Sequence, residues 1–326
     1  MENFIKHDLI TSDSYDKKSV EQAWALIKTS NKITLLTHSQ PDGDGVSACA
    51  TLDYILSRMG KKIETVYPNK PELNFKRCPQ NILINKHAQI PDLIIACDAA
   101  NYERLYFPDL FKSIPLINID HHVSNSLNGK FNFVNGNSSS ACEELYILLS
   151  SWNANMIDQY VAECLLFGIL YDSQLFHTQS TNSRTLKIAA NLMDHGANLF
   201  QIKTELLSNK SYKVLILWGK LLSNIKVSPS KNAVWAVVTQ QDLKNAKVEM
   251  SSLIGFNNLM SQICDVDVTL FFYETEQGKT KVSLRSKIMD VNEFAKQFGG
   301  GGHTNSAGIL CDKPIAQVVE DVTSKL

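Results

Sequence analysis

Short apolar runs separated by polar turns dominate the first 200 residues of the chain. Four runs end abruptly in polar loops, and this pattern predicts buried β-strands. They cover residues 33–37, 62–67, 93–97 and 115–119. Apolar positions recur at helical spacing in residues 18–30, 47–58, 138–152, 161–171 and 181–195. Strand, turn and helix in succession are typical of βαβ units, so we predict an α/β fold with a parallel sheet.

The pattern changes in the last third of the chain, after one or two helices that are predicted within residues 199–226. Strands are predicted there at residues 233–239, 266–274 and 281–286, with helices around 251–262 and at the end of the chain. Because 326 residues are many for one core, we expect two domains. The predicted parts are a parallel-sheet α/β domain at 1–195, a helical linker at 196–225 and a smaller mixed α/β domain at 226–326.

Histidine or aspartate follows directly after three of the predicted strands. His38 follows the first strand, Asp98 the third, and Asp120-His121-His122 the fourth. In an open α/β sheet, ligands bind in the crevice beyond the carboxyl ends of the strands. We therefore expect these side chains to share one crevice.

Further carboxylates stand at related positions. Asp42 and Asp44 lie in the turn after His38, and Asp172 ends the apolar segment 161–171. Pro-Asp-Gly is also typical of a turn that caps a helix, so capping and ligand binding are both open for this turn.

Five carboxylates and three imidazoles in one crevice require compensating positive charge. Oxygen-rich sites with imidazole ligands suit manganese or magnesium. Two such ions about 3.5–4 Å apart can clamp a phosphoryl group and ionise a water. Asp98, alone after a central strand, is the candidate bridging ligand. The chemistry that these residues indicate is hydrolysis of a phosphate ester.

A second set of residues, near the end of the chain, suits an anion. Four consecutive glycines, Gly299–Gly302, precede His303. Such a run forms either a flexible loop or a nest of backbone N–H groups around an anion. Arg285 lies on a predicted strand whose basic face is either solvated or part of the same anion site.

The composition narrows the class of ligand. A net charge of −1 gives no overall field for capturing long or duplex nucleic acid, whereas a small anion held by local cations fits this balance. The seven cysteines never form Cys-x-x-Cys, which predicts free thiols in a reducing compartment. The first residues lack a signal-peptide layout and no apolar run reaches membrane-spanning length, so we expect a soluble cytoplasmic protein without a membrane partner.

Five spaced motifs resemble those of the DHH phosphoesterase superfamily, in the branch that carries a DHHA1 domain. They are His-x-x-Pro-Asp-x-Asp at 38–44, Asp98, Asp120-His121-His122 followed by Ser124-Asn125, Asp172, and Gly-Gly-Gly-His at 300–303. The resemblance covers nearly the whole chain and is greatest to the NrnA-type members. It implies hydrolysis of short oligonucleotides (nanoRNA, or linear dinucleotides such as pApA) and of 3′-phosphoadenosine 5′-phosphate (pAp).

The resemblance also implies roles for individual residues. The metal ligands that it implies are His38, Asp42 and Asp98 for one ion and Asp44, Asp98, His121 and Asp172 for the other. Asp120 and His122 would lie behind the ligands or against the scissile phosphate, as catalytic residues together with Asp98. The implied substrate-binding residues are Arg285, Gly300, Gly301, Gly302 and His303, with Arg184 as a further candidate.

The implied cofactor is a pair of Mn²⁺ ions, with Mg²⁺ or Co²⁺ as substitutes. The implied partners are short single-stranded RNA or DNA and small nucleotides, and a homodimer is compatible with the family. The chain departs from the family pattern at Ser47-Ala48, where Gly-Ser is common, and at Ser306, where alanine is more usual. Neither position is a ligand, so these departures concern packing or substrate preference.

Alternative functions stay open at this point. Cyclic-dinucleotide hydrolysis involves the same phosphodiester bond, and a nucleotide-binding regulator without catalysis would use the same fold. RecJ-type exonucleases carry extra domains for which this chain has no room, and family II pyrophosphatases lack the Gly-Gly-Gly-His motif. The sequence leaves the polarity of cleavage and the natural substrate undecided.

Overall fold

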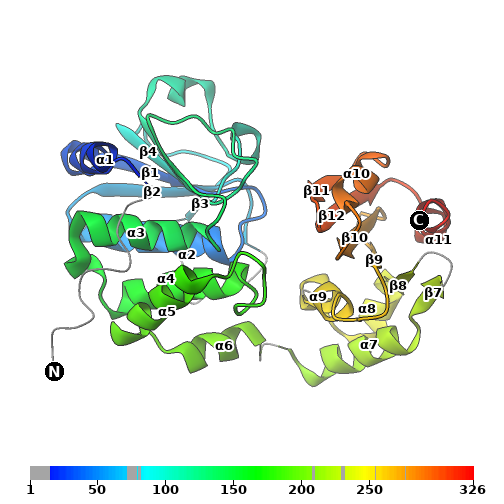
Figure 1. The fold of residues 1–326 in the computed structure, drawn as a ribbon. Helices are drawn as coiled ribbons and strands as arrows, with labels where there is room; N and C mark the ends of the chain where they lie inside the picture. The colour runs from blue at the N-terminus through cyan, green and yellow to red at the C-terminus, as the bar shows by residue number, and fades with distance from the viewer. Residues whose placement is uncertain are drawn as a thin grey trace. The chain divides into compact units, whose positions relative to one another are not determined.

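The structure is a computed structural model, and it describes residues 15–71, 79, 82–207, 210–228, 232–253, 255–275 and 277–326. The chain divides into two compact units, Met1–Ser208 and Asn209–Leu326, each with its own sheet and buried core (Figure 1). Cys78 lies outside the described residues, as does part of the Asn- and Pro-rich segment 68–91.

The first unit contains six α-helices, six strands and three short 3₁₀ helices within the described residues. The α-helices are α1 (Lys17–Thr29), α2 (Gly43–Arg58), α3 (Ala141–Asn153), α4 (Gln159–Asp172), α5 (Ser183–Asp194) and α6 (Leu199–Leu207). The strands are β1 (Lys32–Leu36), β2 (Lys62–Tyr67), β3 (Ile82–Ile84), β4 (Leu93–Cys97), β5 (Leu116–Asp120) and β6 (Phe131–Val134). The 3₁₀ helices are η1 (Tyr102–Arg104), η2 (Asp109–Ser113) and η3 (Ala154–Met156).

The sheet of this unit is parallel throughout, with the strand order β3-β2-β1-β4-β5-β6. Ile33 lies opposite Leu93, and Ile94 lies opposite Leu116. The chain moves outward from β1 to β3 on one side and from β4 to β6 on the other, so the order reverses between β1 and β4. This reversal creates a crevice beyond the carboxyl ends of the two strands, and the predicted parallel α/β fold is confirmed.

Both faces of this sheet are buried, which explains why its central strands are continuous apolar runs. Ile33 and Leu35 belong to the large core that α1 to α5 share with the sheet. Leu36 and Ile94 point to the other face, where they pack against Leu105 and other residues of the segment between β4 and β6. Figure 1 shows α2, α3 and α4 together on one side of the sheet.

The start of α2 differs from the sequence prediction. The apolar spacing predicts this helix from residue 47, whereas it begins at Gly43. The carboxylate of Asp42 accepts hydrogen bonds from the backbone N–H groups of Asp44 (3.0 Å) and Gly45 (3.3 Å), so the polar turn is itself the first turn of the helix. The apolar pattern also fails to predict β6, whose four residues are too few to show a period.

The second unit contains a mixed sheet and short helices. The helices are α7 (Tyr212–Ser223), α8 (Gln240–Ala246), η5 (Met250–Leu253), α9 (Phe256–Met260), α10 (Val291–Lys296) and α11 (Ile315–Thr323). The strands are β7 (Lys226–Ser228), β8 (Ala233–Val238), β9 (Val268–Glu274), β10 (Thr280–Ser286), β11 (Gly301–His303) and β12 (Ser306–Cys311). Their order is β11-β12-β10-β9-β8-β7, and only β8 and β9 pair in parallel among the described strands.

The helices predicted as a linker pack on different units. Ile202 of α6 belongs to the core of the first unit, and Leu217 and Leu221 of α7 belong to a core cluster of the second. The predicted boundaries at 195 and 226 stay a prediction, since the compact units meet at Ser208 and Asn209. The glycine-rich segment is not simply a flexible loop, because it forms the antiparallel pair β11–β12.

Two further expectations concern cysteines and membrane spans. The six cysteines that the structure describes are all free, and Cys49, Cys97, Cys142 and Cys164 among them are buried, which agrees with the predicted free thiols. Within the described ranges, none of the helices combines the length and apolar character that a bilayer crossing requires.

Because the two units have separate cores, we predict separate unfolding transitions. A cavity in one core should lower the free energy of unfolding of that unit alone. We expect Leu284→Ala, at a fully buried position of the second unit, to destabilise that unit by about 2–5 kcal/mol. Leu148→Ala should do the same to the first unit, and Leu310→Ala, at a position that is 55% exposed, should change little. Calorimetry checks this, and equal shifts of all transitions in both core variants would show one cooperative unit instead.

Candidate metal centre

Three neighbouring strands deliver the predicted site residues to one edge of the sheet. His38 follows β1, Asp98 follows β4, and Asp120 is the last residue of β5, in the strand order β1-β4-β5. All three are buried, with exposed fractions of 5%, 2% and 0%. The first prediction from the sequence, that these strand ends meet, is therefore confirmed.

The carboxylate of Asp98 lies between the histidines. Its Oδ2 is 3.3 Å from His38 Nε2, and its Oδ1 is 3.5 Å from His121 Nε2 and 3.6 Å from His122 Nδ1. Oδ1 is buried and accepts no hydrogen bond from any described residue. The backbone of Asp98 is left-handed (φ +56°), a conformation that costs about 1–3 kcal/mol for a non-glycine residue. An unsatisfied carboxylate oxygen held at such a cost suits a ligand that is itself positive.

Two groups of potential metal ligands share Asp98. In the first group, ligand atoms of His38, Asp42 and Asp98 lie within 4.8 Å of one another. The second group contains Asp98 with Asp120, His121 and His122 at the same spacing. Asp98 is thus the residue common to both, as a bridging ligand would have to be.

Asp120 holds His122 in a fixed orientation. Its Oδ1 accepts from the His122 Nδ1 atom (2.7 Å) and from the backbone N–H of His121 (2.8 Å). Its Oδ2 accepts from the side-chain amide of Asn125, whose Nδ2 also donates to the Ala99 carbonyl (3.1 Å). The role of Asn125 is missing from the sequence argument, although its place just after Asp120-His121-His122 is a signal that could have found it.

Asp44 and Asp172 reach the same centre from helices. Asp172, the last residue of α4, has its Oδ2 3.5 Å from His121 Nε2. Asp44 accepts from the backbone N–H groups of Ala141 (2.6 Å) and Cys142 (3.0 Å) at the start of α3. Its assignment as a metal ligand stays a prediction, because both of its oxygens have these partners here.

Two glycines are needed where α2 and α4 approach the centre. A Cβ on Gly45 would lie 2.1 Å from Thr37 Oγ1 and 3.3 Å from Asp98 Oδ2. A Cβ on Gly168 would lie 2.8 Å from Asp44 Oδ1. A larger residue would therefore clash with Thr37 at Gly45, and with Cys142 and Asp44 at Gly168.

The pKa shifts of the buried groups indicate that the carboxylates of the centre need additional positive charge. Burial raises the pKa of Asp44 to about 7, with repulsion from Asp98 adding to it. Burial also raises the pKa of Asp172 to about 8, although His121 opposes this rise. Burial disfavours the charged form of His38, but its hydrogen bonds to Asp42 and Asp98 outweigh this and raise its pKa to about 11.

The pKa of Asp98 is lowered, whereas the pKa values of Asp44 and Asp172 are raised. Burial favours the neutral acid, yet the adjacent His121 and His38 imidazoles hold the pKa of Asp98 well below its usual range. Protons on the histidines and on the neighbouring aspartates compensate the negative charge of Asp98 in this structure. A bound cation would replace those protons. Carboxylate oxygens suit Mn²⁺ or Mg²⁺, so this oxygen-rich set of residues is compatible with a divalent cation of that kind.

Arg184, a candidate for substrate binding, is engaged with buried acids. Its Nε donates to Glu143 (2.7 Å) and its Nη2 donates to Glu144 (3.1 Å) and to the Ser138 hydroxyl. Both glutamates lie in the first turn of α3 and are fully buried. This network neutralises the guanidinium, and a role in substrate binding stays a prediction for Arg184.

The predicted anion residues of the second unit lie on neighbouring strands of its sheet. Arg285 is on β10, opposite Ser306 of β12, and β12 pairs in turn with β11 (Gly301–His303). The Arg285 guanidinium donates to the Leu284 carbonyl (3.0 Å), and burial lowers its pKa. A cation held in a partly buried position is suited to an anionic ligand.

The alternative of a backbone nest is not supported. The N–H groups of Gly299 and Gly300 donate to the Lys296 and Ala295 carbonyls, and that of Gly302 donates to Asn292 Oδ1 (2.9 Å). Since these three donors are already paired within the protein, they form no nest in this structure. The assignment of Gly300, Gly301, Gly302 and His303 to substrate binding stays a prediction.

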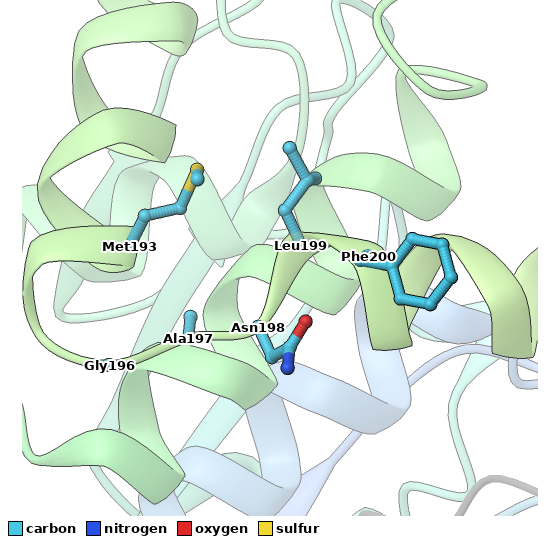
Figure 2. A pocket seen from close by; sticks show the side chains of 6 residues that line it. All are labelled: Met193, Gly196, Ala197, Asn198, Leu199 and Phe200. Carbon is cyan, nitrogen blue, oxygen red and sulfur yellow. The ribbon is translucent and has the colours of Figure 1, made fainter.

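A separate hollow of about 480 Å³ lies elsewhere on the first unit, at the turn between α5 and α6 (Figure 2). The residues that line it are Met193, Gly196, Ala197, Asn198, Leu199 and Phe200. It contains no ionisable side chain and none of the predicted site residues, so it offers nothing for phosphate chemistry.

A parallel sheet with an aspartate–histidine centre at its switch point, followed by a mixed sheet, defines a two-domain α/β class of protein. Residues 32–169 match the DHH family, N-terminal domain, and residues 230–326 match the DHHA1 domain. The chain therefore contains an N-terminal DHH domain and a C-terminal DHHA1 domain, which confirms the resemblance seen in the motifs.

Named relatives align with most of this chain, and solved structures share its fold. The bifunctional oligoribonuclease and PAP phosphatase NrnA of Mycoplasma genitalium is 28% identical over 323 residues, which are 95% of this chain and 98% of that protein. NrnA of Bacillus subtilis is 28% identical over 85% of this chain and 88% of that protein. An exopolyphosphatase-related protein of Bacteroides fragilis has a similar fold, with a TM-score of 0.87 at 23% identity over 95% of both chains. A manganese-bound exonuclease RecJ is more distant, with a TM-score of 0.57 at 14% identity over 95% of this chain and 94% of that one.

The shifted pKa values predict how stability without metal depends on pH. Unfolded aspartates lose their protons near pH 4 and unfolded histidine near 6.5, whereas folded Asp44, Asp172 and His38 keep theirs to about 7, 8 and 11. Folding therefore takes up protons between pH 5 and 8, and the free energy of unfolding should fall as pH rises, by up to about 1.4 kcal/mol per pH unit for each proton. Asp172 contributes less, because its side chain is 31% exposed and screened by water.

Urea unfolding in a chelating buffer at pH 5.5 and 8 measures this slope. Mn²⁺ competes with the protons, so its stabilising effect should be larger at pH 8. The variant Asp44→Asn, which is close in volume, should flatten the slope. Stability without metal that rises from pH 5.5 to 8 would contradict the charge arrangement described here.

Proposed function

We propose that this chain is a metal-dependent phosphoesterase that hydrolyses short oligonucleotides and pAp through two-metal activation of water. The observation that carries the proposal is the buried Asp98 carboxylate, which lies in both ligand groups and keeps Oδ1 without a hydrogen bond among the described residues. The activities printed in the names of the NrnA relatives support the same class of substrate.

The assignment of ligands to each ion follows the family resemblance, and for the second ion it differs from the group Asp98, Asp120, His121 and His122. A pair of divalent cations, when bound, supplies Lewis-acid stabilisation of the phosphoryl oxygens and a hydroxide nucleophile. His38 and Asp42 would hold one ion, Asp44, His121 and Asp172 the other, and Asp98 both. Manganese is our candidate because the donor set is rich in oxygen and includes imidazole.

His122 is our candidate for proton transfer to the leaving oxygen. Its Nδ1 atom is committed to Asp120 Oδ1 at 2.7 Å, so the ring presents Nε2 to the substrate. Asp120 is fully buried and would stabilise the imidazolium form, which is the form that can donate a proton. Burial alone disfavours that form, yet the hydrogen bond that His122 donates to Asp120 outweighs it and raises the pKa of His122.

The second unit would bind the part of the substrate that does not react. Arg285, a partly buried guanidinium, and the strand residues Gly301, Gly302 and His303 lie on the same sheet. Gly300 precedes this strand, and its N–H donates to the Ala295 carbonyl. We assign phosphate binding to Arg285 and close backbone approach to the glycines.

A panel of substrates tests the reaction class. The full-length chain with Mn²⁺ should release mononucleotide from pApA and phosphate from pAp, and should act slowly on pyrophosphate. Binding of these compounds without product would instead indicate a nucleotide-binding regulator. A cyclic dinucleotide in the same panel tests the remaining alternative.

Loss of the shared ligand should abolish activity almost completely. Asp98→Asn keeps the volume of the side chain, removes its charge and leaves one oxygen, so it cannot bridge two ions and turnover should fall by more than about 100-fold. His38→Ala should cost about 10–100-fold and recover partly at high Mn²⁺, since it affects one ion. Asp194→Ala, at an exposed position of α5, is the matched control. Turnover near that of the unmodified chain in Asp98→Asn would refute the two-metal proposal.

Activity should decrease steeply as the substrate lengthens from two to about ten nucleotides. The net charge of −1 offers no basic track along which a polymer could be bound. Arg285→Ala should raise KM more than it lowers kcat, because it removes binding that is uniform through the reaction. Lys281→Ala on the same strand is the control. Competition between labelled 2-mer and 24-mer RNA measures the preference, and equal degradation of the 24-mer would contradict it.

A further inference from the structure

Arg104 is a cation beside the centre that has no part in the chemistry proposed so far. It is the last residue of η1, in the segment that follows β4 and Asp98. Its Nη2 atom lies 2.9 Å from His38 Nδ1, and its carbonyl accepts from the Ser39 N–H (2.7 Å). The backbone and the side chain of Arg104 are thus both held against the loop that carries His38.

The contact between Arg104 and His38 competes with another one. His38 Nδ1 also lies 2.7 Å from the Ser39 carbonyl oxygen. A ring nitrogen either donates a hydrogen or accepts one, so Nδ1 can bond to the carbonyl or to the guanidinium, but not to both.

When a metal ion is bound, the Ser39 carbonyl is the partner of Nδ1. His38 Nε2 faces Asp42 (3.6 Å) and Asp98 (3.3 Å), so it is the nitrogen that would bind the ion. A histidine that binds metal through Nε2 carries its hydrogen on Nδ1 and donates it to a neighbouring acceptor. That acceptor is the Ser39 carbonyl, and Arg104 then faces an N–H group instead of a lone pair.

A metal-loaded site therefore leaves the guanidinium of Arg104 without a protein acceptor. Among the residues that the structure describes, no carboxylate or carbonyl oxygen accepts a hydrogen bond from this side chain. Arginine stays charged at all ordinary pH values, and its planar fork of N–H donors matches the oxygens of a phosphate. Arg184 differs in this respect, because Glu143 and Glu144 accept from it.

We propose that Arg104 binds a second phosphate of the substrate, adjacent to the one that is hydrolysed. The inference rests on the proposed function, since it assumes that the scissile phosphate lies at the ions. Nδ1 and Nε2 are on opposite sides of the imidazole ring, so the guanidinium is separated by the ring from anything held at Nε2. A guanidinium at that position would contact the phosphate next to the one held at the ions. pAp and pApA have such a second phosphate, and a simple monophosphate does not.

The test uses the full-length chain with Arg104→Ala and Arg104→Lys, and Arg58→Ala as the matched control on α2. Titration calorimetry first measures binding of Mn²⁺ alone. It then measures binding of two probes to the Mn²⁺-loaded protein, a slowly hydrolysed bis(phosphorothioate) analogue of pAp and AMP. Steady-state kinetics compare pApA with the 4-nitrophenyl ester of thymidine 5′-monophosphate, which has one phosphate.

We expect Arg104→Ala to bind Mn²⁺ as the unmodified chain does and to bind the two-phosphate analogue about 10–100-fold more weakly, as the loss of a charge-assisted hydrogen bond predicts. Affinity for AMP and KM for the thymidine ester should change by less than about threefold. Arg104→Lys should retain part of the affinity, because it keeps the charge and loses the fork.

Three results would overturn the inference. Weaker Mn²⁺ binding in Arg104→Ala would mean that the residue acts by positioning His38. Equal losses of affinity for AMP and the two-phosphate analogue would mean that Arg104 binds no second phosphate. Unchanged affinities would mean that Arg104 does not contact the substrate. If the unmodified chain neither binds Mn²⁺ nor hydrolyses pApA, the proposed function itself fails and this inference falls with it.

Discussion

Repulsion among buried carboxylates is the constraint on which the rest of this structure depends. Parallel strands bring Asp98 and Asp120 to one edge of the sheet, and α2 and α4 add three more acids. Taking such charges out of water costs several kcal/mol each unless opposite charge accompanies them. The histidines beside Asp98 and the raised pKa values of Asp44 and Asp172 both reduce this repulsion. A divalent cation would reduce it directly.

Helix capping and ligand binding are compatible for Asp42 and Asp44. Asp42 caps α2 and also lies 3.6 Å from His38 Nε2. Asp44 accepts hydrogen bonds from backbone amides at the start of α3 and also interacts electrostatically with Asp98 and His121. Because the amides at the start of a helix carry partial positive charge, they help to hold carboxylates that would otherwise repel each other. The same residues therefore start the helices and shape the centre.

Arginine side chains near the centre show how context decides the use of a charge. Arg184 is paired with two buried glutamates, so its charge serves the packing of α3 against α5. Arg104 faces a histidine nitrogen that has a better partner in the Ser39 carbonyl. Sequence spacing gives no way to tell these arginines apart, because the difference lies in which acceptors the fold brings to each guanidinium.

The sequence by itself determined four of the six strands of the first unit, the residues at the carboxyl ends of three of them and the family. Local patterns suffice there, because apolar strands buried on both faces and polar strand ends are visible within a few residues. It did not determine β6 and the β11–β12 pair, whose short strands depend on partners distant in the chain. Only the tertiary structure decided that Asp98 is shared by both ligand groups, that the glycine amides are already paired and that Arg104 lies against His38. Hydrogen-bond partners between distant segments follow from the packing of the whole unit, and no local pattern encodes them.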